Sequence, residues 1–344
     1  MVTMQDIAAK AGVSTTTVSR VLNTKNSAIP ISKDTRARVV KIAREMGYSP
    51  NMYAKTLRTK KSMLLGLVVW DLTDFFFSDI IRGIENTLHS SEYNLLLNSA
   101  EADEERERIC LEKMRDLHVD GILLVGGTVD SVRHYIDDLG IGKSSVVLIG
   151  TAVGGEDVNS VTVDNFTGGY IGMEYMLNLH RKRYVYLSGT QKTMDMERRL
   201  MGVRQAVEDL FALEKFEDRA VGPGEKAGYD AAMEFLPDLP LPAAVFAVSD
   251  LTAFGVIRAV KDRNLRVPED IAVMGFDDIS MSTFFFPRLS TIRQPRYKMG
   301  EMGATLLLDS IKGKGKERGE NSGEQPEKRK QILLSPELVT RESS

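Results

Sequence analysis

The segment Val13–Asn23, VSTTTVSRVLN, contains four consecutive hydroxyl residues directly before an apolar pattern with helical spacing. Such side chains weaken a helix interior, because they compete for backbone hydrogen bonds, but they favour a helix start. Ser14 is therefore the expected cap of a short helix in which Val18 and Val21 face inward. This helix is predicted to end near Asn23.

Two further helices are predicted on either side of this segment. Thr3 is expected to cap a helix over Met4–Ala11, which Gly12 ends, and Ser32 to cap a helix that runs through Met46. Two short helices joined by a turn that contains glycine, with a third helix as a brace, form a helix-turn-helix DNA-binding unit.

The second helix presents a defined outward face. On a helical wheel with Val18 toward the core, Thr16 and Arg20 lie on the opposite side. Thr15 flanks them at the leading edge, whereas Thr17 lies nearer the packed side. The first residues of such a helix contact base edges, and arginine is the usual reader of guanine, so base contacts are predicted here. A purely capping and solubilising role is the alternative.

Charge is distributed unevenly along the 344 residues, whose formal net charge is −3. Residues 1–61 contain twelve lysines and arginines against three acids, a net charge of +9, so the remainder carries −12. A small basic module attached to a large acidic body suggests that the module binds a polyanion such as DNA. Chance solvation of a basic surface is the alternative.

The basic module ends in a linker, YSPNMYAKTLRTKKS, over residues 48–62. Pro50 and Asn51 can open a short helix over about residues 52–58, although an isolated helix of this length is marginal in water. We therefore expect it to become ordered on DNA or on a partner. Leu57, between basic residues, has the form of an apolar wedge that enters a minor groove.

Bulk properties argue against several other classes of protein. No run of eighteen apolar residues occurs and the N-terminus lacks a signal-peptide pattern, so we expect a cytoplasmic protein without a membrane span. Cys110 is the only cysteine and is expected to be a buried thiol. The four histidines are scattered and match no metal-ligand or nucleophile motif, so we expect no enzyme and no cofactor.

From Ser62 onward, short apolar runs alternate with amphipathic helical stretches. This alternation predicts an α/β body with doubly wound parallel sheets, and the number of strands fits two sheets better than one. Ligands of such folds bind beyond the carboxyl ends of the strands. The predicted strands are residues 63–70, 93–99, 121–126, 145–150, 184–189, 243–249 and 271–276, with helices between them that include residues 78–90, 104–117 and 252–263.

Side chains suited to a polar ligand follow several of these strands. Carboxylates suit sugar hydroxyls, and aromatic rings suit the faces of sugars or bases. An aspartate at a strand or helix boundary also often serves only as a helix cap, and this simpler interpretation stays open. The residues at these strand ends are Asp71, Phe76, Phe77, Ser249, Asp250 and Asp277.

Six motifs, spread in order over nearly the whole chain, resemble the lac-repressor and galactose-repressor family of bacterial transcription regulators. They are TMQDIAAKAGVSTTTVSRVLN, AREMGYSPNMYAKTLRTKKS, LLGLVVWDLTDFFFSDIIRGIE, VDGILLVGG, VMGFDD and LLSPELVTRESS. The resemblance implies an all-α N-terminal helix-turn-helix domain and a body with the periplasmic-binding-protein architecture. That body consists of two similar doubly wound subdomains, linked by three crossovers, with a cleft between them.

The resemblance also implies specific DNA contacts. Thr15, Thr16 and Arg20 stand at the base-reading positions of the recognition helix. Ala54 and Leu57 stand in the hinge helix, with Leu57 at the intercalating position. The full set of expected DNA contacts is Ser14, Thr15, Thr16, Thr17, Arg20, Asn23, Ala54, Leu57 and Arg58.

For the body, the resemblance implies effector contacts from the aromatic pair, from a polar residue at Ser249 or Asp250, and from the first aspartate after GF. An arginine is expected five residues before the glycine of MERRLMG, but that position is Glu197. A carboxylate cannot replace a guanidinium as a donor. The expected effector contacts are Asp71, Phe76, Phe77, Ser249, Asp250, Asp277 and Gln294, with Arg198 brought in by a local shift.

Glu197 is also compatible with two alternatives. In the first, the ligand is not a typical sugar. In the second, the protein is controlled by a phosphoprotein corepressor, as in the catabolite-control branch of the family. Asp74 and Phe75 also replace the usual Asn-Pro pair, so the entrance of the pocket is expected to be altered.

Domain bounds follow from these assignments. A helix-turn-helix domain is expected over residues 1–49, a hinge over 50–61 and the effector-binding body over 62–344. The first subdomain is expected at about 62–162 and 293–326, and the second at about 163–292 and 327–344. Residues 312–330, charged and rich in glycine, are expected to form a surface loop, with a nucleic-acid-binding arm as the alternative. No heptad tail follows, so a homodimer is expected.

These expectations combine into one function. The chain is predicted to be a transcriptional regulator, most simply a repressor, that binds a pseudo-palindromic operator as a homodimer under the control of a small sugar-like effector. A solute-binding protein without DNA activity would need a signal peptide in place of the basic module. An enzyme on the same scaffold would need a catalytic motif that the sequence lacks.

Overall fold

The computed structural model describes residues 2–23, 30–48, 61–127, 146–151, 158–190, 193–210, 212–313 and 329–344. The chain divides into two compact units, Met1–Ser62 and Met63–Ser344. Each unit has its own hydrophobic core. The expected hinge contacts Ala54, Leu57 and Arg58 lie outside the described residues, as do most of residues 312–330.

The first unit contains the three predicted helices. Gly12 ends the first of them in the left-handed conformation, with a φ of 64°, which glycine adopts without the steric cost of a side chain. The second helix therefore starts in a new direction only a few residues later. The helices are α1 (Met4–Ala11), α2 (Thr15–Asn23) and α3 (Lys33–Glu45).

Hydroxyl side chains cap these helices, as the sequence predicts. Thr3 and Asp6 bond reciprocally at the start of α1, and the Ser32 hydroxyl accepts from the backbone N–H of Thr35 at the start of α3. The inward positions of α2 are also confirmed. A single small core joins the three helices, formed by Ile7, Ala8, Ala11, Val18, Val21, Val39 and Ala43.

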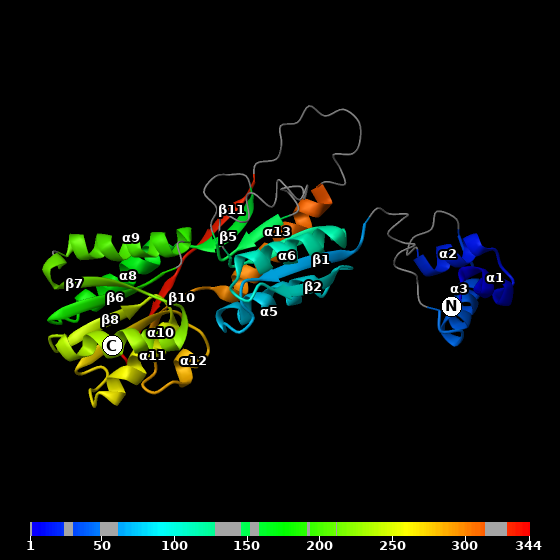
Figure 1. The fold of residues 1–344 in the computed structure, drawn as a ribbon. Coiled ribbons are helices and arrows are strands. Elements are labelled where there is room, and N and C mark those ends of the chain that lie inside the picture. Colours follow the sequence, from blue (N-terminus) through cyan, green and yellow to red (C-terminus); the bar gives the residue numbers. More distant parts are fainter. Residues whose placement is uncertain are drawn as a thin grey trace, which may run out of the picture. The chain divides into compact units, whose positions relative to one another are not determined.

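The described residues of the second unit form two six-stranded sheets (Figure 1). The first sheet is parallel throughout, in the order β11-β5-β4-β3-β1-β2. Val69 of β1 is in register with Ser99 of β2 and Val125 of β3, so these strands end at one edge. The strands are β1 (Leu64–Val69), β2 (Asn94–Ser99), β3 (Gly121–Val125), β4 (Val146–Ile149), β5 (Asn159–Val163) and β11 (Gln331–Leu334).

The second sheet has the order β12-β10-β9-β8-β6-β7 and is parallel except for β12, which pairs antiparallel with β10. The two sheets have similar strand orders, which confirms the prediction of two doubly wound subdomains. The strands are β6 (Arg183–Gly189), β7 (Phe216–Val221), β8 (Ala243–Ala247), β9 (Ile271–Asp277), β10 (Ser290–Arg293) and β12 (Glu337–Val339).

Helices cover both faces of each sheet (Figure 1). The first sheet lies between α6 (Glu104–Asp116) on one face and α5 (Phe76–Leu88) with α13 (Arg296–Gly313) on the other. Cys110 of α6 is buried, as predicted. None of the helices in the described residues is long and apolar enough to cross a membrane.

The second sheet is covered in the same way. One face carries α8 (Asn165–Leu177) and α9 (Met194–Asp209), and the other carries α10 (Gly224–Phe235) and α11 (Asp250–Asp262). The one-turn helix α12 (Met281–Phe284) follows β9. The resulting cores consist almost entirely of aliphatic and aromatic side chains. Because such cores are closely packed, the strands are held firmly, and so are the polar residues at their carboxyl ends.

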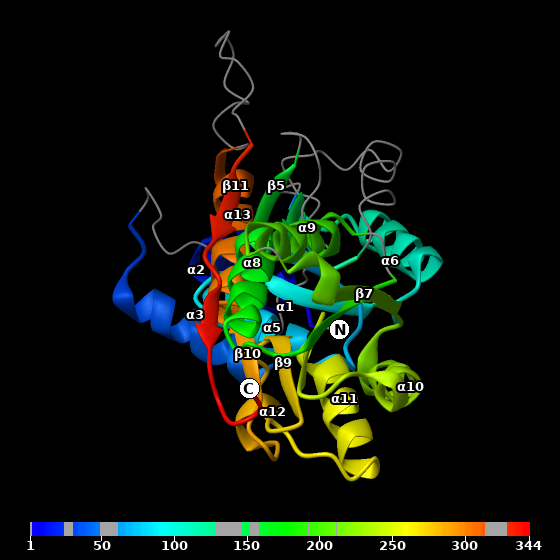
Figure 2. The ribbon, with the colours of Figure 1, turned by 90° about the vertical axis from the view of Figure 1, so that its left-hand side faces the viewer.

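Three connections in the described residues join the subdomains: β5 to α8, β10 to α13, and β11 to β12. The expected bounds placed all of residues 327–344 in the second subdomain, and this is wrong for β11. Leu334 pairs with Val163, so Gln331–Leu334 completes the edge of the first sheet and the chain crosses only after it. Figure 2 shows this C-terminal segment, in red, passing from β11 toward β10.

Candidate functional sites

Helix α2 exposes the start of its first turn. The Ser14 hydroxyl accepts from the backbone N–H of Thr17 at 3.1 Å and lies 2.9 Å from the Thr17 hydroxyl. Ser14 therefore caps the helix, and the hydroxyls of Ser14 and Thr17 are hydrogen-bonded to each other. Thr15 and Thr16 are exposed and have no hydrogen-bond partner among the described residues, so their side chains are available to an outside ligand.

Arg20 lies one turn further along α2 and is partly exposed. Its guanidinium makes no hydrogen bond or ion pair with the described residues, whereas Val18 and Val21 beside it are fully or almost fully buried. The structure thus brings Thr15, Thr16 and Arg20 to the unpacked side of one helix. Asn23 is the last residue of α2, and its side chain lies outside the described part of the chain.

A cavity of about 210 Å³ lies between the two sheets of the second unit, at the carboxyl ends of their strands. This is where ligands bind in open α/β folds. The structure brings together six of the eight expected effector contacts on its walls: Asp71, Phe76, Phe77, Ser249, Asp277 and Gln294.

The wall formed by the first sheet is aromatic and acidic. Trp70 and Asp71 follow β1, and Phe76 and Phe77 begin α5 with their rings edge to face at 5.1 Å. Asp74, two residues before α5, accepts from the backbone N–H of Phe76 at 2.8 Å. Burial raises the pKa of Asp74 above its ordinary value, and the neighbouring Asp71 carboxylate adds to this rise.

The wall formed by the second sheet carries Arg199 of α9. Its Nη2 and Nε donate to Asn165 Oδ1 at 2.8 and 3.2 Å, and Nη1 donates to the carbonyl oxygen of Val248. The guanidinium carbon lies 3.4 Å from the ring centre of Phe276. Arg199 is only 7% exposed, so these contacts fix its orientation at the cavity.

A second group of polar side chains lies beside Arg199. Asp195 Oδ1 accepts from Asn165 Nδ2 at 2.9 Å and from the Thr162 hydroxyl at 3.2 Å. Thr162 belongs to β5 and Asn165 begins α8, so this group sits at one of the connections between the subdomains. All three side chains are buried and line the cavity.

Asp277 and Gln294 form the third polar group of this wall. Asp277 Oδ1 accepts from Gln294 Nε2 at 2.7 Å. Burial raises the pKa of Asp277 well above its ordinary value, while the Arg199 guanidinium opposes the rise. The backbone of Asp277 has a φ of 120°, which costs free energy for any residue other than glycine and is typical of functional sites.

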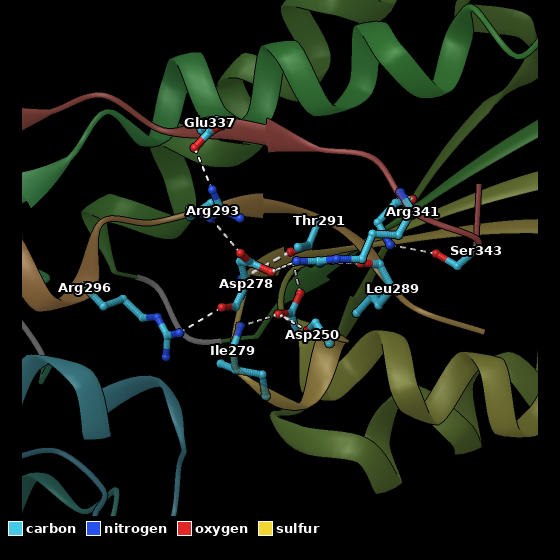
Figure 3. A network of polar contacts seen from close by, with 12 residues as sticks. Asp250, Asp278, Ile279, Leu289, Thr291, Arg293, Arg296, Glu337, Arg341 and Ser343 are labelled. Carbon is cyan, nitrogen blue, oxygen red and sulfur yellow. Dashed lines mark hydrogen bonds and ion pairs between the residues drawn. The ribbon is translucent and has the colours of Figure 1, made fainter. Parts of the chain in front are cut away.

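Two expected effector contacts do not reach the cavity. Arg198 is exposed on α9 and does not line it, so Arg199, and not Arg198, supplies the guanidinium. Asp250 is fully buried beneath the cavity. Its carboxylate accepts from the backbone N–H of Ile279 and from the hydroxyls of Ser282 and Thr291. Figure 3 shows it pointing toward Ile279 and Thr291.

Several lining residues were not predicted from the sequence. Asn165 follows β5, a strand that the polar sequence in this region does not predict. Asp195 and Arg199 are four residues apart and share one face of α9, a spacing that identifies them once that helix is placed. Trp70 directly precedes the predicted Asp71.

The cavity combines carboxylates, one guanidinium and aromatic faces, which suits a small polar ligand with a ring. No group of three or more histidine, cysteine or acidic side chains in the described ranges could hold a metal ion. These groups lie on both walls of the cavity, so they can bind and orient such a ligand from two sides.

Comparison with known proteins gives matches along the chain. The family model of bacterial regulatory proteins, lacI family, matches residues 3–51, and that of a periplasmic binding protein-like domain matches residues 173–344. The HTH-type transcriptional repressor CytR of Escherichia coli (strain K12) is 33% identical over 312 residues, which are 90% of this chain and 90% of that relative.

Two solved structures extend the similarity over the whole chain. A lac repressor dimer bound to operator and the anti-inducer ONPF has a TM-score of 0.85 at 24% identity, over 99% of this chain and 98% of that one. At this identity the likeness concerns the fold. A complex of the transcriptional regulator CelR with cellobiose has a TM-score of 0.70 at 28% identity and covers 100% of both chains.

Proposed function

The chain belongs to the lacI family of bacterial regulatory proteins, and from this premise we propose which residues read its operator and which hold its effector. It is a DNA-binding transcriptional repressor controlled by an effector, and it is not an enzyme. We propose that it acts as a dimer, as the lac repressor does on its operator. We place it in the cytoplasm, because that compartment contains the operator DNA.

Operator reading is assigned to Thr15, Thr16 and Arg20 of α2. The observation that carries this assignment is that these side chains are free of partners among the described residues while the opposite face of the helix is buried. Arg20 donates through a fork of paired N–H groups to guanine, and the threonines contact bases or phosphates. Ser14 and Thr17 hold the helix start at the DNA surface.

Effector binding is assigned to the cavity between the sheets. Phe76, Phe77 and Trp70 contact the ring of the ligand, and Asp277, Gln294 and Arg199 bond to its polar groups. A small ligand that touches both walls favours one arrangement of the subdomains, and this arrangement alters operator affinity. Since Arg199 provides a guanidinium, Glu197 no longer argues for a phosphoprotein corepressor.

The operator-reading assignment is tested with two substitutions at one position. DNA sites are first selected from random sequence with the wild-type protein. Arg20→Ala should then weaken binding to the selected site by about tenfold to a hundredfold, since one bidentate contact is worth about 1–3 kcal/mol. Non-specific binding at the same salt concentration should change much less.

Arg20→Lys is the matched control, because it keeps the charge and loses the fork of donors. It should retain non-specific affinity and lose most of the preference for the selected site. If Arg20→Ala keeps the wild-type preference, Arg20 does not read bases and the assignment is wrong.

A further inference from the structure

Charge is distributed unevenly over the two walls of the cavity. The first wall presents the carboxylates of Asp71 and Asp74, and no basic side chain of the described residues lines it. The second wall presents Asp195 and Asp277 together with Arg199, the one basic residue that lines the cavity in the described part of the chain. The cavity thus has four acidic side chains and one basic side chain among its described lining residues, and both charged side chains of the first wall are acidic.

The carboxylates of the first wall have no cationic partner within the described residues. Asp71 Oδ1 accepts from the backbone N–H and the hydroxyl of Thr73 at 2.8 and 2.7 Å, and Asp74 Oδ1 accepts from the N–H of Phe76. All these donors belong to the same short loop. In each case Oδ2 has no hydrogen-bond partner in the described ranges.

The nearest cations are held by other groups. Arg199 bonds to the amide oxygen of Asn165 and the carbonyl of Val248 on the opposite wall. Arg296 lies near Asp74 and partly offsets its negative charge, but its guanidinium pairs with Asp79 at 3.0 Å and donates to two carbonyl oxygens. Neither arginine makes an ion pair with Asp71 or Asp74.

A second feature points to a polar ligand. Thr151, beyond the end of β4, is 2% exposed and lines the cavity, yet its hydroxyl has no hydrogen-bond partner among the described residues. A buried hydroxyl without a partner costs about 1–3 kcal/mol. The hydroxyl and the two carboxylates line the same cavity, where each is open to a donor or acceptor of a polar ligand.

Aromatic rings surround this acidic wall. Trp70 is adjacent to Asp71 in the chain, and Phe76 and Phe77 follow Asp74, all lining the same cavity. Aromatic faces attract cations through the ring quadrupole, by about 0.5–2 kcal/mol depending on desolvation. Carboxylates beside aromatic faces, without a basic residue among the described residues of this wall, form an environment suited to a positively charged group.

We propose that the effector is a small hydroxylated amine, such as an amino sugar, whose ammonium group binds Asp74 and Asp71 on the first wall. This inference rests on the proposed function of the cavity and specifies its ligand class. The hydroxyls of the ligand meet Arg199, Asn165 and Asp277 on the second wall. Phosphorylated or carboxylated ligands are disfavoured, because they place an anion among four acids.

The experiment uses Trp70 as its reporter, since it is the only tryptophan of the chain and lines the cavity. Its fluorescence is titrated in the full-length protein with three ring compounds that differ in one group: 2-aminocyclohexanol, cyclohexane-1,2-diol and 2-hydroxycyclohexanecarboxylate. The amine should bind at least about tenfold more tightly than the diol, as expected for a charge-assisted hydrogen bond. The carboxylate should bind more weakly than the diol.

Asp74→Asn should reduce the advantage of the amine over the diol to below about threefold, because the ammonium group loses one of its two carboxylates. The amide oxygen of asparagine can still accept from the backbone N–H of Phe76, so the loop before α5 should keep its conformation. Asp71→Asn serves as a second variant if this one fails to fold. Glu208→Gln removes an exposed charge near the other end of α9 and should leave the preference unchanged.

The inference is overturned if the diol or the carboxylate binds as tightly as the amine, or if the amine does not alter Trp70 emission. Operator binding by the same preparation is measured in parallel. Intact operator binding combined with a preference for the neutral or anionic ring compound contradicts the ligand class alone. Loss of operator selectivity contradicts the proposed function itself.

Discussion

Asp250 is a fully buried carboxyl group whose hydrogen-bond donors are a backbone N–H and two hydroxyls. Burial raises its pKa to about 7, whereas an aspartate in an unfolded chain titrates near about 4. Between these values the folded protein holds a proton that the unfolded chain releases. The contribution of Asp250 to stability is therefore lost as the pH rises through this window.

We predict that Asp250→Asn flattens the pH dependence of stability. The amide has no proton to lose in this range, and the hydroxyls of Ser282 and Thr291 can turn to accept from its NH₂ group. One pKa unit corresponds to about 1.4 kcal/mol. From about pH 4.5 to about pH 7.5, the free energy of unfolding in urea should fall by on the order of 3 kcal/mol more for the wild type than for the variant.

A suitable control is Asp116→Asn, which neutralises an exposed carboxylate at the end of α6 and should leave the wild-type pH profile intact. Asp277, whose pKa is also raised by burial and by the nearby Asp250 charge, remains in all these proteins. Removing the Asp250 charge lowers the pKa of Asp277, which adds to the flattening in Asp250→Asn. Parallel profiles for wild type and Asp250→Asn would show that Asp250 is ionised throughout the range.

The same residue shows what can be predicted from a sequence at this scale. The strand before Asp250 identifies its backbone position at the cavity edge, but its side chain turns toward Thr291, forty-one positions later in the chain. Sequence spacing contains no information on that choice. The orientation of Arg199 can be predicted more easily. Once the bounds of α9 are known, helical spacing places Arg199 on the same buried face as Asp195 and Gly202.

At the level of elements, α5 and α13 pack with their backbones in direct contact. A side chain at Gly83 would place its Cβ 2.2 Å from the carbonyl oxygen of Tyr297, and one at Gly300 would lie 2.0 Å from that of Ile80. Contacts this short require the two helices to move apart. Because α5 begins at the cavity with Phe76, this packing also positions the aromatic wall.

We predict that Gly83→Ala lowers the free energy of unfolding by about 1–3 kcal/mol, the usual cost of overpacking. The helix propensity of alanine opposes this by about 1 kcal/mol, so a destabilised variant demonstrates that the clash dominates. The measurement is urea unfolding followed by circular dichroism. Emission of Trp70 should also shift, because Phe76 and Phe77 move with α5.

Glu85→Ala is the matched control on the exposed side of the same helix. It should change stability by no more than about 0.5 kcal/mol. Equal stability of Gly83→Ala and wild type would mean that the helices separate at no cost, and the close approach would then have no structural importance.

Strands with continuous apolar runs were predicted and are confirmed, including β1, β3, β4, β8 and β9. Among the strands that were not predicted, three have polar sequences, namely β5 (NSVTV), β7 (FEDRAV) and β10 (STIR). Their polar side chains resemble loop sequence because β7 lies at a sheet edge, while β5 and β10 lead into the crossovers. Strand pairing, rather than local composition, determines these elements, and only the folded sheet supplies the pairing.

For the molecule as a whole, the two subdomains must move together if a ligand in the cavity is to influence operator binding. Arg296 begins α13 directly after a crossover and is 7% exposed. Its Nη2 donates to the carbonyl oxygen of Asp278 in the second subdomain at 2.8 Å and pairs with Asp79 of α5 at 3.0 Å. Figure 3 shows Arg296 extended toward Asp278.

Asp278 is itself held firmly within its own subdomain. Its carboxylate pairs with Arg293 at 2.7 Å and with Arg341 at 2.6 Å, and its neighbour Asp277 lines the cavity. Arg296 therefore connects a fixed point beside Asp277 to the start of α5, where Phe76 lies. The guanidinium of Arg296 thus bonds to both subdomains and links the two walls of the cavity.

We predict that Arg296→Ala uncouples the walls without unfolding either sheet. Amide hydrogen exchange in the first turn of α5, residues 76–80, should accelerate by at least about tenfold, which corresponds to about 1.4 kcal/mol of lost protection. Urea unfolding should become less cooperative, because each subdomain has its own core and loses a contact with the other. Exchange within β3 and β8 should remain at the wild-type rate.

Arg82→Ala distinguishes this link from a general effect of charge. Arg82 pairs with the same Asp79 at 3.1 Å, but it lies within α5 and its side chain is 66% exposed, so its pair is screened by solvent and worth at most about 1 kcal/mol. Its loss should leave exchange in residues 76–80 nearly unchanged. If both variants accelerate exchange equally, the pair with Asp79 stabilises only α5, and the subdomains are coupled through the crossover backbones and not through Arg296.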